Sequence, residues 1–363
     1  MRAILVAALC LTTGALALWA QPRAGTLSIY YIDTEGGQAT LFVGPTGESL
    51  LVDTGNTGER DLGRIVETLA AAGVRRIDHL WTTHYHGDHV GALLALAKQV
   101  PVMRFYDHGT PHPNDRIVST AFLSAYDELS RGKRTIISPG DTLRMAGLDI
   151  TAVASANRYI RANLAGGGRQ NPACSGVAPK DESGYIDPDN GESAGFVLAY
   201  GRFRTIDLGD LTWNGELDLM CPTNRIGTVD LYLTSHHGLE RSGSPALVHA
   251  LRPRVAVMNN GTRKGGAPDT FRVLRESPGL EDLWQLHWSH NVGLDNAPAT
   301  FVANVDDAAT VASVLTAPPP AGRGGGPAPT HSPAHLVKVS AQQDGTFTVT
   351  NTRTGFSKTY RAR

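Results

Sequence analysis

Short apolar runs alternate with helical spacings in the first part of the chain. Runs rich in β-branched and aromatic residues, bounded by turn residues, predict strands at 27–32, 40–43, 49–52 and 77–82. Apolar positions recur at i, i+3, i+4 and i+7 over residues 62–73 and again from Asp88 onward, which predicts two amphipathic helices. This alternation is typical of an α/β protein in which helices cover a sheet.

The remainder of the chain repeats these patterns around a long irregular segment. Residues 158–192 are rich in Gly, Pro, Asn and Asp and predict a loop near whatever site the fold carries. Strands are predicted at 194–200, 203–207, 231–234 and 255–258, with helices opened by Ser244-Pro245 and by Pro268. We therefore expect one domain at 24–315, a flexible Pro/Gly-rich segment at 316–334 and a C-terminal β-hairpin extension at 335–363.

The first residues have the features of a signal peptide. Arg2 supplies the positive start, residues 4–18 are apolar, and Ala20 precedes Gln21 where cleavage is expected. The alternative is an uncleaved membrane anchor, although the apolar run is shorter than a spanning helix requires and is interrupted by polar residues. Residues 1–20 thus predict a periplasmic or secreted protein with no stable membrane span after cleavage.

Net charge and cysteine content bear on the binding partners and on a possible disulfide. The formal net charge is −1 and the pI about 6.9, so overall charge does not favour binding to nucleic acid, although a local basic groove stays open. Removal of the leader leaves Cys174 and Cys221 of the three cysteines. An oxidising compartment permits one disulfide between them, but spacing alone does not decide whether the two thiols meet.

The densest chemical signal lies between the strand predicted at 77–82 and the helix that follows it. His84, His86, Asp88 and His89 fall within six positions of a chain with 13 histidines. Imidazole and carboxylate groups are good zinc ligands, and a turn between a strand and a helix can direct several of them into one space. The alternative, a chance cluster of solvated histidines, does not explain why the carboxylate is interleaved with them.

The HxHxDH pattern resembles the signature of the metallo-β-lactamase superfamily, which implies an αββα sandwich with one or two metal ions. Further segments resemble its motifs in the expected order: YIDTEGG at 31–37, SLLVDTG at 49–55, LGD at 208–210 and SHHG at 235–238. The resemblance implies that Asp210 bridges two divalent ions, most readily zinc, with manganese or iron fitting the same donors. It also implies that Asp53 orients the ligands. From the residues alone, Asp210 has an alternative interpretation as a helix N-cap.

Within the superfamily, the chain is most similar to the branch that includes the metallo-hydrolase domain of competence-type DNA-uptake proteins. One departure is Ala267, which stands before Pro268 where that branch usually has His. A second is the third ligand of the first metal, because His108 and His112 come too early in the chain. Around the expected position stand Asn190, Glu192 and Ser193.

The roles of the adjacent histidines at 236 and 237 depend on local geometry. Neighbouring side chains at the end of a strand diverge, so one is expected to ligate a metal and the other to face substrate. We therefore predict the metal ligands and the catalytic residues as two sets. The ligands are His84, His86, Asp88, His89, Asp210 and His236, and the catalytic residues are Asp88 and His237.

Together, the leader and the predicted metal ligands indicate an exported hydrolase that attacks a phosphodiester or another small anionic ester with a metal-bound hydroxide. Arg263 and Lys264 are candidates for binding an anion, or else belong to a solvated loop, and His290 is a candidate for lining the pocket. Two alternatives stay open: a lactone or β-lactam hydrolase on the same metals, and a non-catalytic binding protein in which the metal is a structural pin. The oligomeric state is left open.

Overall fold

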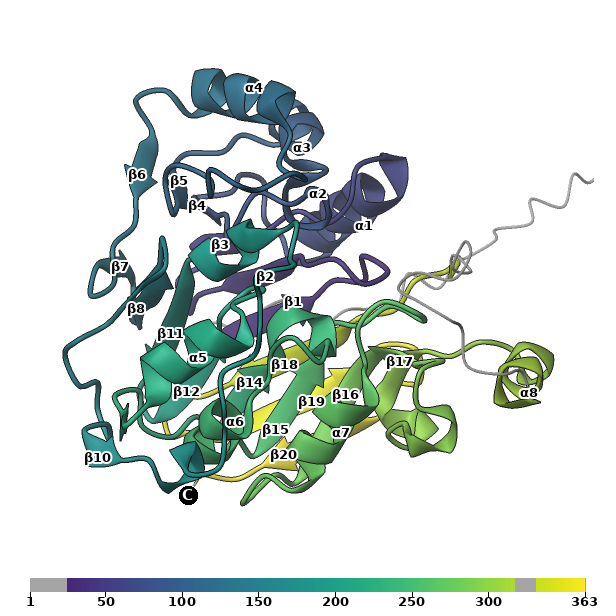
Figure 1. Ribbon diagram of the computed structural model, residues 1–363. Helices are drawn as coiled ribbons and strands as arrows, with labels where there is room; N and C mark the ends of the chain where they lie inside the picture. The colour runs from purple at the N-terminus through teal and green to yellow at the C-terminus, as the bar shows by residue number, and fades with distance from the viewer. Residues whose placement is uncertain (1–24, 317–330, 363) are drawn as a thin grey trace, which may run out of the picture.

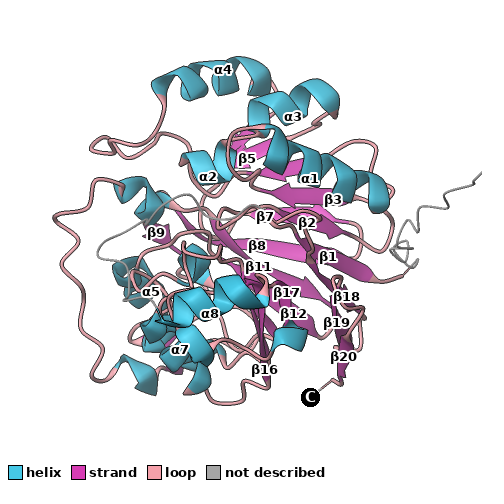
Figure 2. Ribbon diagram, turned by 90° about the vertical axis from the view of Figure 1, so that its right-hand side faces the viewer, coloured by secondary structure: helices cyan, strands magenta, loops and turns pink. Residues whose placement is uncertain are grey.

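The computed structural model describes residues 25–316 and 331–362, which fold into two facing β-sheets covered by helices. Figure 2 shows the strands in the middle, with α1, α3 and α4 on one side and α5 and α7 on the other. The predicted fold class, an αββα sandwich, is confirmed. The signal peptide predicted at 1–20 and most of the flexible segment predicted at 316–334 lie outside the described residues.

The first sheet has the order β20-β19-β18-β1-β2-β3-β4-β5-β6. Its strands are β1 (Leu27–Tyr31), β2 (Thr40–Val43), β3 (Ser49–Val52), β4 (His79–Trp81), β5 (Phe105–Asp107), β6 (Arg134–Ile136), β18 (Val337–Ala341), β19 (Phe347–Asn351) and β20 (Ser357–Tyr360). The helices that follow its strands are α1 (Glu59–Ala71), α2 (Gly87–Val90), α3 (Leu93–Gln99) and α4 (Thr120–Ser130).

The second sheet has the order β17-β16-β15-β14-β12-β11-β8-β7, with β9 paired to β8. Its strands are β7 (Thr142–Met145), β8 (Leu148–Ser155), β9 (Arg158–Tyr159), β11 (Gly195–Tyr200), β12 (Phe203–Asp207), β14 (Leu231–Leu233), β15 (Val255–Met258), β16 (Asp282–His287) and β17 (Val302–Asn304). Its helices are α5 (Trp213–Met220), α6 (Pro245–Leu251), α7 (Pro268–Arg275) and α8 (Ala308–Thr316), and a separate ribbon pairs β10 (Arg169–Gln170) with β13 (Thr223–Asn224).

Three apolar layers explain why the strands read as continuous hydrophobic runs. One layer lies between the sheets, where Phe42 and Trp81 of the first sheet pack edge-to-face on Phe196 of the second. The other two layers lie between each sheet and its helices. All five residues of β1 are buried, because strands covered on both faces have no solvent side.

The C-terminal segment belongs to the first sheet. The sequence predicted a hairpin at 335–363 outside the main domain, but β18, β19 and β20 form a three-stranded antiparallel meander whose β18 pairs with β1 from Leu27 with Ala341 to Tyr31 with Val337. Figure 1 shows these yellow strands beside the purple β1, so the two ends of the described chain lie side by side in one sheet. The third strand, β20, was not predicted.

The helix predicted from Asp88 is two helices, α2 and α3, separated at Gly91. A Cβ on Gly91 would lie 2.2 Å from the backbone nitrogen of Thr57, so only glycine lets the chain pass here. Among the described residues, no helix combines the length and the apolar character that crossing a bilayer requires.

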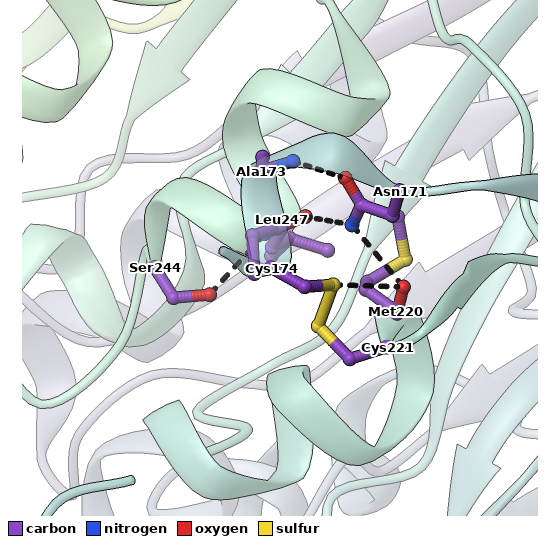
Figure 3. The surroundings of a disulfide bond; sticks show 8 residues. Asn171, Ala173, Cys174, Met220, Cys221, Ser244 and Leu247 are labelled. Carbon is purple, nitrogen blue, oxygen red and sulfur yellow. Dashed lines mark hydrogen bonds between the residues drawn. A yellow bond between two sulfur atoms is a disulfide. The ribbon is translucent and has the colours of Figure 1, made fainter. Parts of the chain in front are cut away.

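A disulfide between Cys174 and Cys221 fastens the irregular segment to the second sheet's helices. Their Cα atoms are 5.9 Å apart, and the bond joins the turn after Asn171 to the end of α5. Figure 3 shows that Asn171 also donates its amide to the carbonyl of Met220, at 3.1 Å. Because the two cysteines are separated by 47 positions in the sequence, closing this loop stabilises the fold by about 4 kcal/mol.

Candidate metal centre

Seven side chains, six of them buried, converge beyond the ends of β4, β12 and β14, and we call them the Asp210 cluster. The most exposed is the carboxylate of Asp88, of which 18% is accessible. The cluster consists of His84, His86, Asp88, His89, Asp210, His236 and His237. All six predicted ligands and both predicted catalytic residues are therefore in one place.

The carboxylate of Asp210 faces a different group of imidazoles with each of its oxygens. Its Oδ1 lies 3.3 Å from Nε2 of His89 and 3.4 Å from Nε2 of His237. Its Oδ2 lies 3.3 Å from Nε2 of His236 and 4.0 Å from Nε2 of His84. This is the arrangement that a carboxylate shared by two neighbouring cations requires.

Each side of Asp210 has its own set of donors. On the Oδ1 side, Asp88, His89, Asp210 and His237 each offer a ligand atom, and these atoms lie within 4.8 Å of one another. On the Oδ2 side, Nε2 of His84 lies 3.0 Å from Nδ1 of His86, with His236 nearby. His236 thus stands on the side where the sequence offered no third ligand.

A tight turn after β12 brings Asp210 to the HxHxDH segment. Gly209 has a φ of 54°, and a Cβ there would lie 2.7 Å from Cβ of Thr83, so glycine permits the close approach. Helix α5 begins at Trp213 with Thr212 as its N-cap residue, so Asp210 does not cap it. Asp207 points elsewhere and accepts hydrogen bonds from Gln38 and from the backbone of Gly209.

The adjacent histidines adopt a backbone conformation that the sequence did not indicate. His236 and His237 have φ values of 54° and 55°, in the left-handed region that costs a non-glycine residue about 1 kcal/mol or more. The expectation that their side chains diverge is wrong, because this turn directs both imidazoles at Asp210. The geometry gives His237, predicted to be catalytic, a place among the ligand atoms, and His236 a place at the opposite oxygen.

Carboxylates outside the cluster hold two of its imidazoles in position. Asp53 lies 2.7 Å from Nδ1 of His89 and also accepts hydrogen bonds from Thr83, as the resemblance implied. Asp115 lies 2.9 Å from Nε2 of His86. Asp115 was not predicted as a site residue, because it lies in a loop without any recognisable motif. Such partners fix the ring orientation and tautomer of a metal ligand.

The other histidines considered from the sequence lie outside the cluster. His108 packs against Tyr85, with its Nε2 3.4 Å from Asp189. Asp189 also accepts the backbone N–H of His112. His290 is 2.5 Å from Asp306 instead of lining this site. Asn190 and Ser193 are buried, and no described contact places either of them, or Glu192, at a ligand position.

Electrostatics prepare Asp210 and His84 for a cation. Against the effect of burial, neighbouring carboxylates raise the pKa of His86 and His89, whose protons a cation would displace. Burial opposes ionisation of Asp210, but His236, His237 and His89 outweigh it and hold the pKa of its carboxyl well below the usual range. Burial, together with His89, keeps the pKa of His84 well below 6.5, so its imidazole is neutral. Neutral imidazoles and ionised carboxylates are the forms that bind metals.

The donor set fits divalent metal ions. It combines imidazole nitrogen with carboxylate oxygen, as zinc, manganese and iron accept. Asp210 Oδ1 is buried and accepts no hydrogen bond from the described residues, which leaves it free to ligate. Lys264 places its ammonium group against Oδ2 of Asp88 and is 41% exposed, so of the two candidate anion-binding residues it is the one at the site.

Comparisons with known proteins agree with this geometry. Residues 33–150 match the family model of the metallo-beta-lactamase superfamily. A UPF0173 metal-dependent hydrolase from Cupriavidus necator is 25% identical over 259 residues, covering 70% of this chain and 81% of that protein. Competence protein ComA from Neisseria gonorrhoeae is 25% identical over 228 residues, 62% of this chain but only 26% of ComA.

Solved structures also match the chain at low sequence identity. The metallo-beta-lactamase fold protein YhfI from Bacillus subtilis is 13% identical, with a TM-score of 0.42, and the match covers 71% of this chain and 95% of YhfI. The fold and the matched motifs define a metal-binding αββα protein. More particularly, residues 33–150 are similar to the metallo-beta-lactamase superfamily domain.

Proposed function

We propose that this chain is an exported, metal-dependent hydrolase that acts on a small anionic ester, with phosphodiesters as the leading class. The observation that carries the proposal is the carboxylate of Asp210, whose two oxygens face separate groups of imidazoles. Two relatives support hydrolysis as the reaction class: the protein from C. necator is named a metal-dependent hydrolase, and so is one from Archaeoglobus fulgidus.

The cluster would hold two divalent cations, zinc first among the candidates. His84, His86 and His236 would hold one, Asp88, His89 and His237 the other, and Asp210 both. Two such ions would supply a bound water whose pKa is lowered toward about 7, and would polarise the oxygen of the substrate. His237 is proposed here as a ligand, in place of the catalytic role predicted from sequence.

Residues of the chain prepare this site and its substrate. Asp53 and Asp115 engage the outer nitrogens of His89 and His86, which leaves the inner nitrogens to face the cluster. Lys264 lies at the rim, where its ammonium group neutralises Asp88. With a cation on Asp88, this ammonium is available to an anionic oxygen of the substrate, and Asp88 is placed to receive the proton of the attacking water.

Export is supported by the leader pattern at 1–20 and by the disulfide between Cys174 and Cys221, because disulfides persist in oxidising compartments. The protein recovered from the periplasm or medium of an expressing cell should begin near residue 21, as measured by mass spectrometry. Recovery of the intact leader on a cytoplasmic protein would contradict the compartment and leave the hydrolase proposal standing.

A substrate panel tests the reaction class. Zinc-loaded protein should hydrolyse bis-(p-nitrophenyl) phosphate faster than nitrocefin or a homoserine lactone, and Asp210→Asn should lose this activity. Hydrolysis of nitrocefin or the lactone alone would overturn the phosphodiester assignment and favour a β-lactam or lactone hydrolase. Metal binding without turnover of any of the three, and without an effect of Asp210→Asn on turnover, would favour a non-catalytic binding protein.

A further inference from the structure

A second group of imidazole and carboxylate side chains converges on the opposite side of the loop after β1. We call Glu35, His287 and His331 the Glu35 cluster. Glu35 Oε2 lies 3.5 Å from Nε2 of His287, and Glu35 Oε1 lies 3.5 Å from Nδ1 of His331. Each residue offers a ligand atom, and these atoms lie within 4.8 Å of one another.

The cluster is buried and incompletely satisfied. The side chain of Glu35 is 4% exposed and that of His287 fully buried. Among the described residues, Glu35 Oε2 and His331 Nδ1 have no hydrogen-bond partner. A buried carboxylate oxygen without a donor is costly, since it has lost water without a replacement. A cation between these atoms would satisfy both.

The surrounding charges leave an excess of negative charge. Asp33, Glu35 and Asp306 bring three carboxylates to the cluster, and Arg64 is the cation that pairs with two of them, at 2.9 Å from Asp33 and 3.2 Å from Glu35. The neighbouring Arg60 is paired with Asp61 instead. A divalent cation would balance the two remaining charges with the histidines neutral. The alternative is protonation of two of the three imidazoles that contact these carboxylates, which are His287, His331 and His290.

The spacing and the supporting contacts match a zinc site. Ligand atoms around a tetrahedral zinc ion, with bonds of about 2.1 Å, lie about 3.4 Å apart. Nε2 of His331 is 3.0 Å from Asp306, so a carboxylate holds the outer nitrogen of this imidazole, as is usual for histidine ligands. Asp33 Oδ1 is hydrogen-bonded to Nε2 of His287 at 2.5 Å and to the backbone N–H of Glu35 at 2.9 Å. Zinc would replace the first of these bonds, which makes Asp33 the candidate for the fourth donor.

We propose that Glu35, His287 and His331, with Asp33 at the fourth corner, bind a structural zinc ion separate from the Asp210 cluster. The ion would tie the end of β16 and the segment that leads into β18 to the loop after β1. A cavity of about 490 Å³, lined in part by Asp33, Arg64 and His331, offers a route from solvent.

The same loop also contacts residues at the Asp210 cluster. A Cβ on Gly36 would lie 2.9 Å from Cβ of Lys264, and the backbone N–H of Gln38 donates to the carbonyl of Asp88 at 3.1 Å. A cation on Glu35 would therefore stabilise a loop that packs against Lys264 and Asp88, without contacting substrate.

Zinc stoichiometry tests the proposal. The purified chain, equilibrated with zinc alone and separated from free metal, should retain three zinc ions by elemental analysis. His331→Ala should retain two, while the matched control His335→Ala, which removes a neighbouring imidazole outside the cluster, should retain three. Equal zinc content in the parent and His331→Ala would overturn the proposal and indicate that protonated imidazoles balance the charge.

The readout is independent of the hydrolase proposal, because activity is not needed to count ions. Failure of the Asp210 cluster to bind metal would lower the parent and His331→Ala equally and preserve the difference of one. If His331→Ala does not fold, as judged by circular dichroism, His287→Gln takes its place: one ion fewer than the parent supports the site, and equal content overturns it.

Discussion

The Asp210 cluster and the Glu35 cluster are built from the same donor types but differ in what surrounds them. Both are buried mixtures of imidazole and carboxylate groups with separations of about 3.3–3.5 Å. In the Asp210 cluster the neighbouring cation, Lys264, is 41% exposed and can meet a substrate. In the Glu35 cluster the neighbouring cation, Arg64, is 11% exposed and engaged by Asp33 and Glu35. Donor chemistry thus predicts metal binding at both, and only the surroundings assign catalysis to one.

The largest expected effect comes from the carboxylate shared by both sides of the catalytic cluster. Asp210→Asn should lower kcat/KM for the best substrate of the panel by about 1,000-fold or more, equivalent to about 4 kcal/mol, because both cations lose their common ligand. Steady-state kinetics with zinc-loaded protein measure this change. Asp181→Asn, at an exposed position, is the matched control and should behave like the parent. Equal kcat/KM in parent and Asp210→Asn would remove the distinction between the clusters.

The next effect concerns the carboxylate that the sequence did not reveal. Asp115→Asn should weaken zinc binding at the His84 and His86 side by 10- to 100-fold, because the amide no longer holds His86 as a charged acceptor does. Competition with a chromophoric chelator measures the dissociation constant. Asp127→Asn, which changes a 63% exposed carboxylate, is the control. An unchanged dissociation constant would show that Asp115 does not position the ligand.

Much of the fold could be predicted from the sequence because most strands are covered on both faces. The runs at β2, β3 and β15 consist of buried residues and were predicted at their observed bounds. The edge strand β20, with the sequence SKTY, has one fully buried position and gave no comparable signal. The pairing of β18 with β1 was not predicted for a related reason, since it is a long-range contact that no local pattern records.

The same contrast governs the two clusters. The HxHxDH motif places four donors within six residues, so the Asp210 cluster was predicted from spacing and resemblance. The left-handed turn at His236 and His237 was not predicted, because it depends on the hydrogen bond from the backbone of His236 to that of Gly209 and not on residue type. The Glu35 cluster joins single residues at 35, 287 and 331, and only the folded chain brings them together.

A smaller effect on KM is expected from Lys264, and it tests whether the exposed lysine at the Asp210 cluster binds substrate, as the buried Arg64 cannot. Lys264→Met should raise KM for an anionic substrate by about 10-fold, or about 1.4 kcal/mol, with kcat changed less than about threefold, because the ammonium contributes to binding more than to the chemical step. Lys358→Met is a matched control: this lysine is 40% exposed and also pairs with an aspartate, Asp282, but lies on β20. A loss confined to kcat would instead assign Lys264 to the chemical step.

The smallest expected effect separates structural from catalytic metal binding. In an Asp210→Asn background, saturating zinc should raise the melting temperature by about 4 °C, because about 100-fold excess over Kd adds about 2.7 kcal/mol to a chain of this size. Adding His287→Gln should abolish this increase, while His335→Ala should leave it intact. Differential scanning fluorimetry with and without zinc measures the shift.

In the otherwise unaltered protein, His287→Gln should keep kcat/KM within about twofold, because His287 contacts Asp33 and Glu35 and no member of the Asp210 cluster. A zinc-dependent shift that survives His287→Gln would place the stabilising ion elsewhere, and a large loss of activity would mean that the two clusters do not act separately.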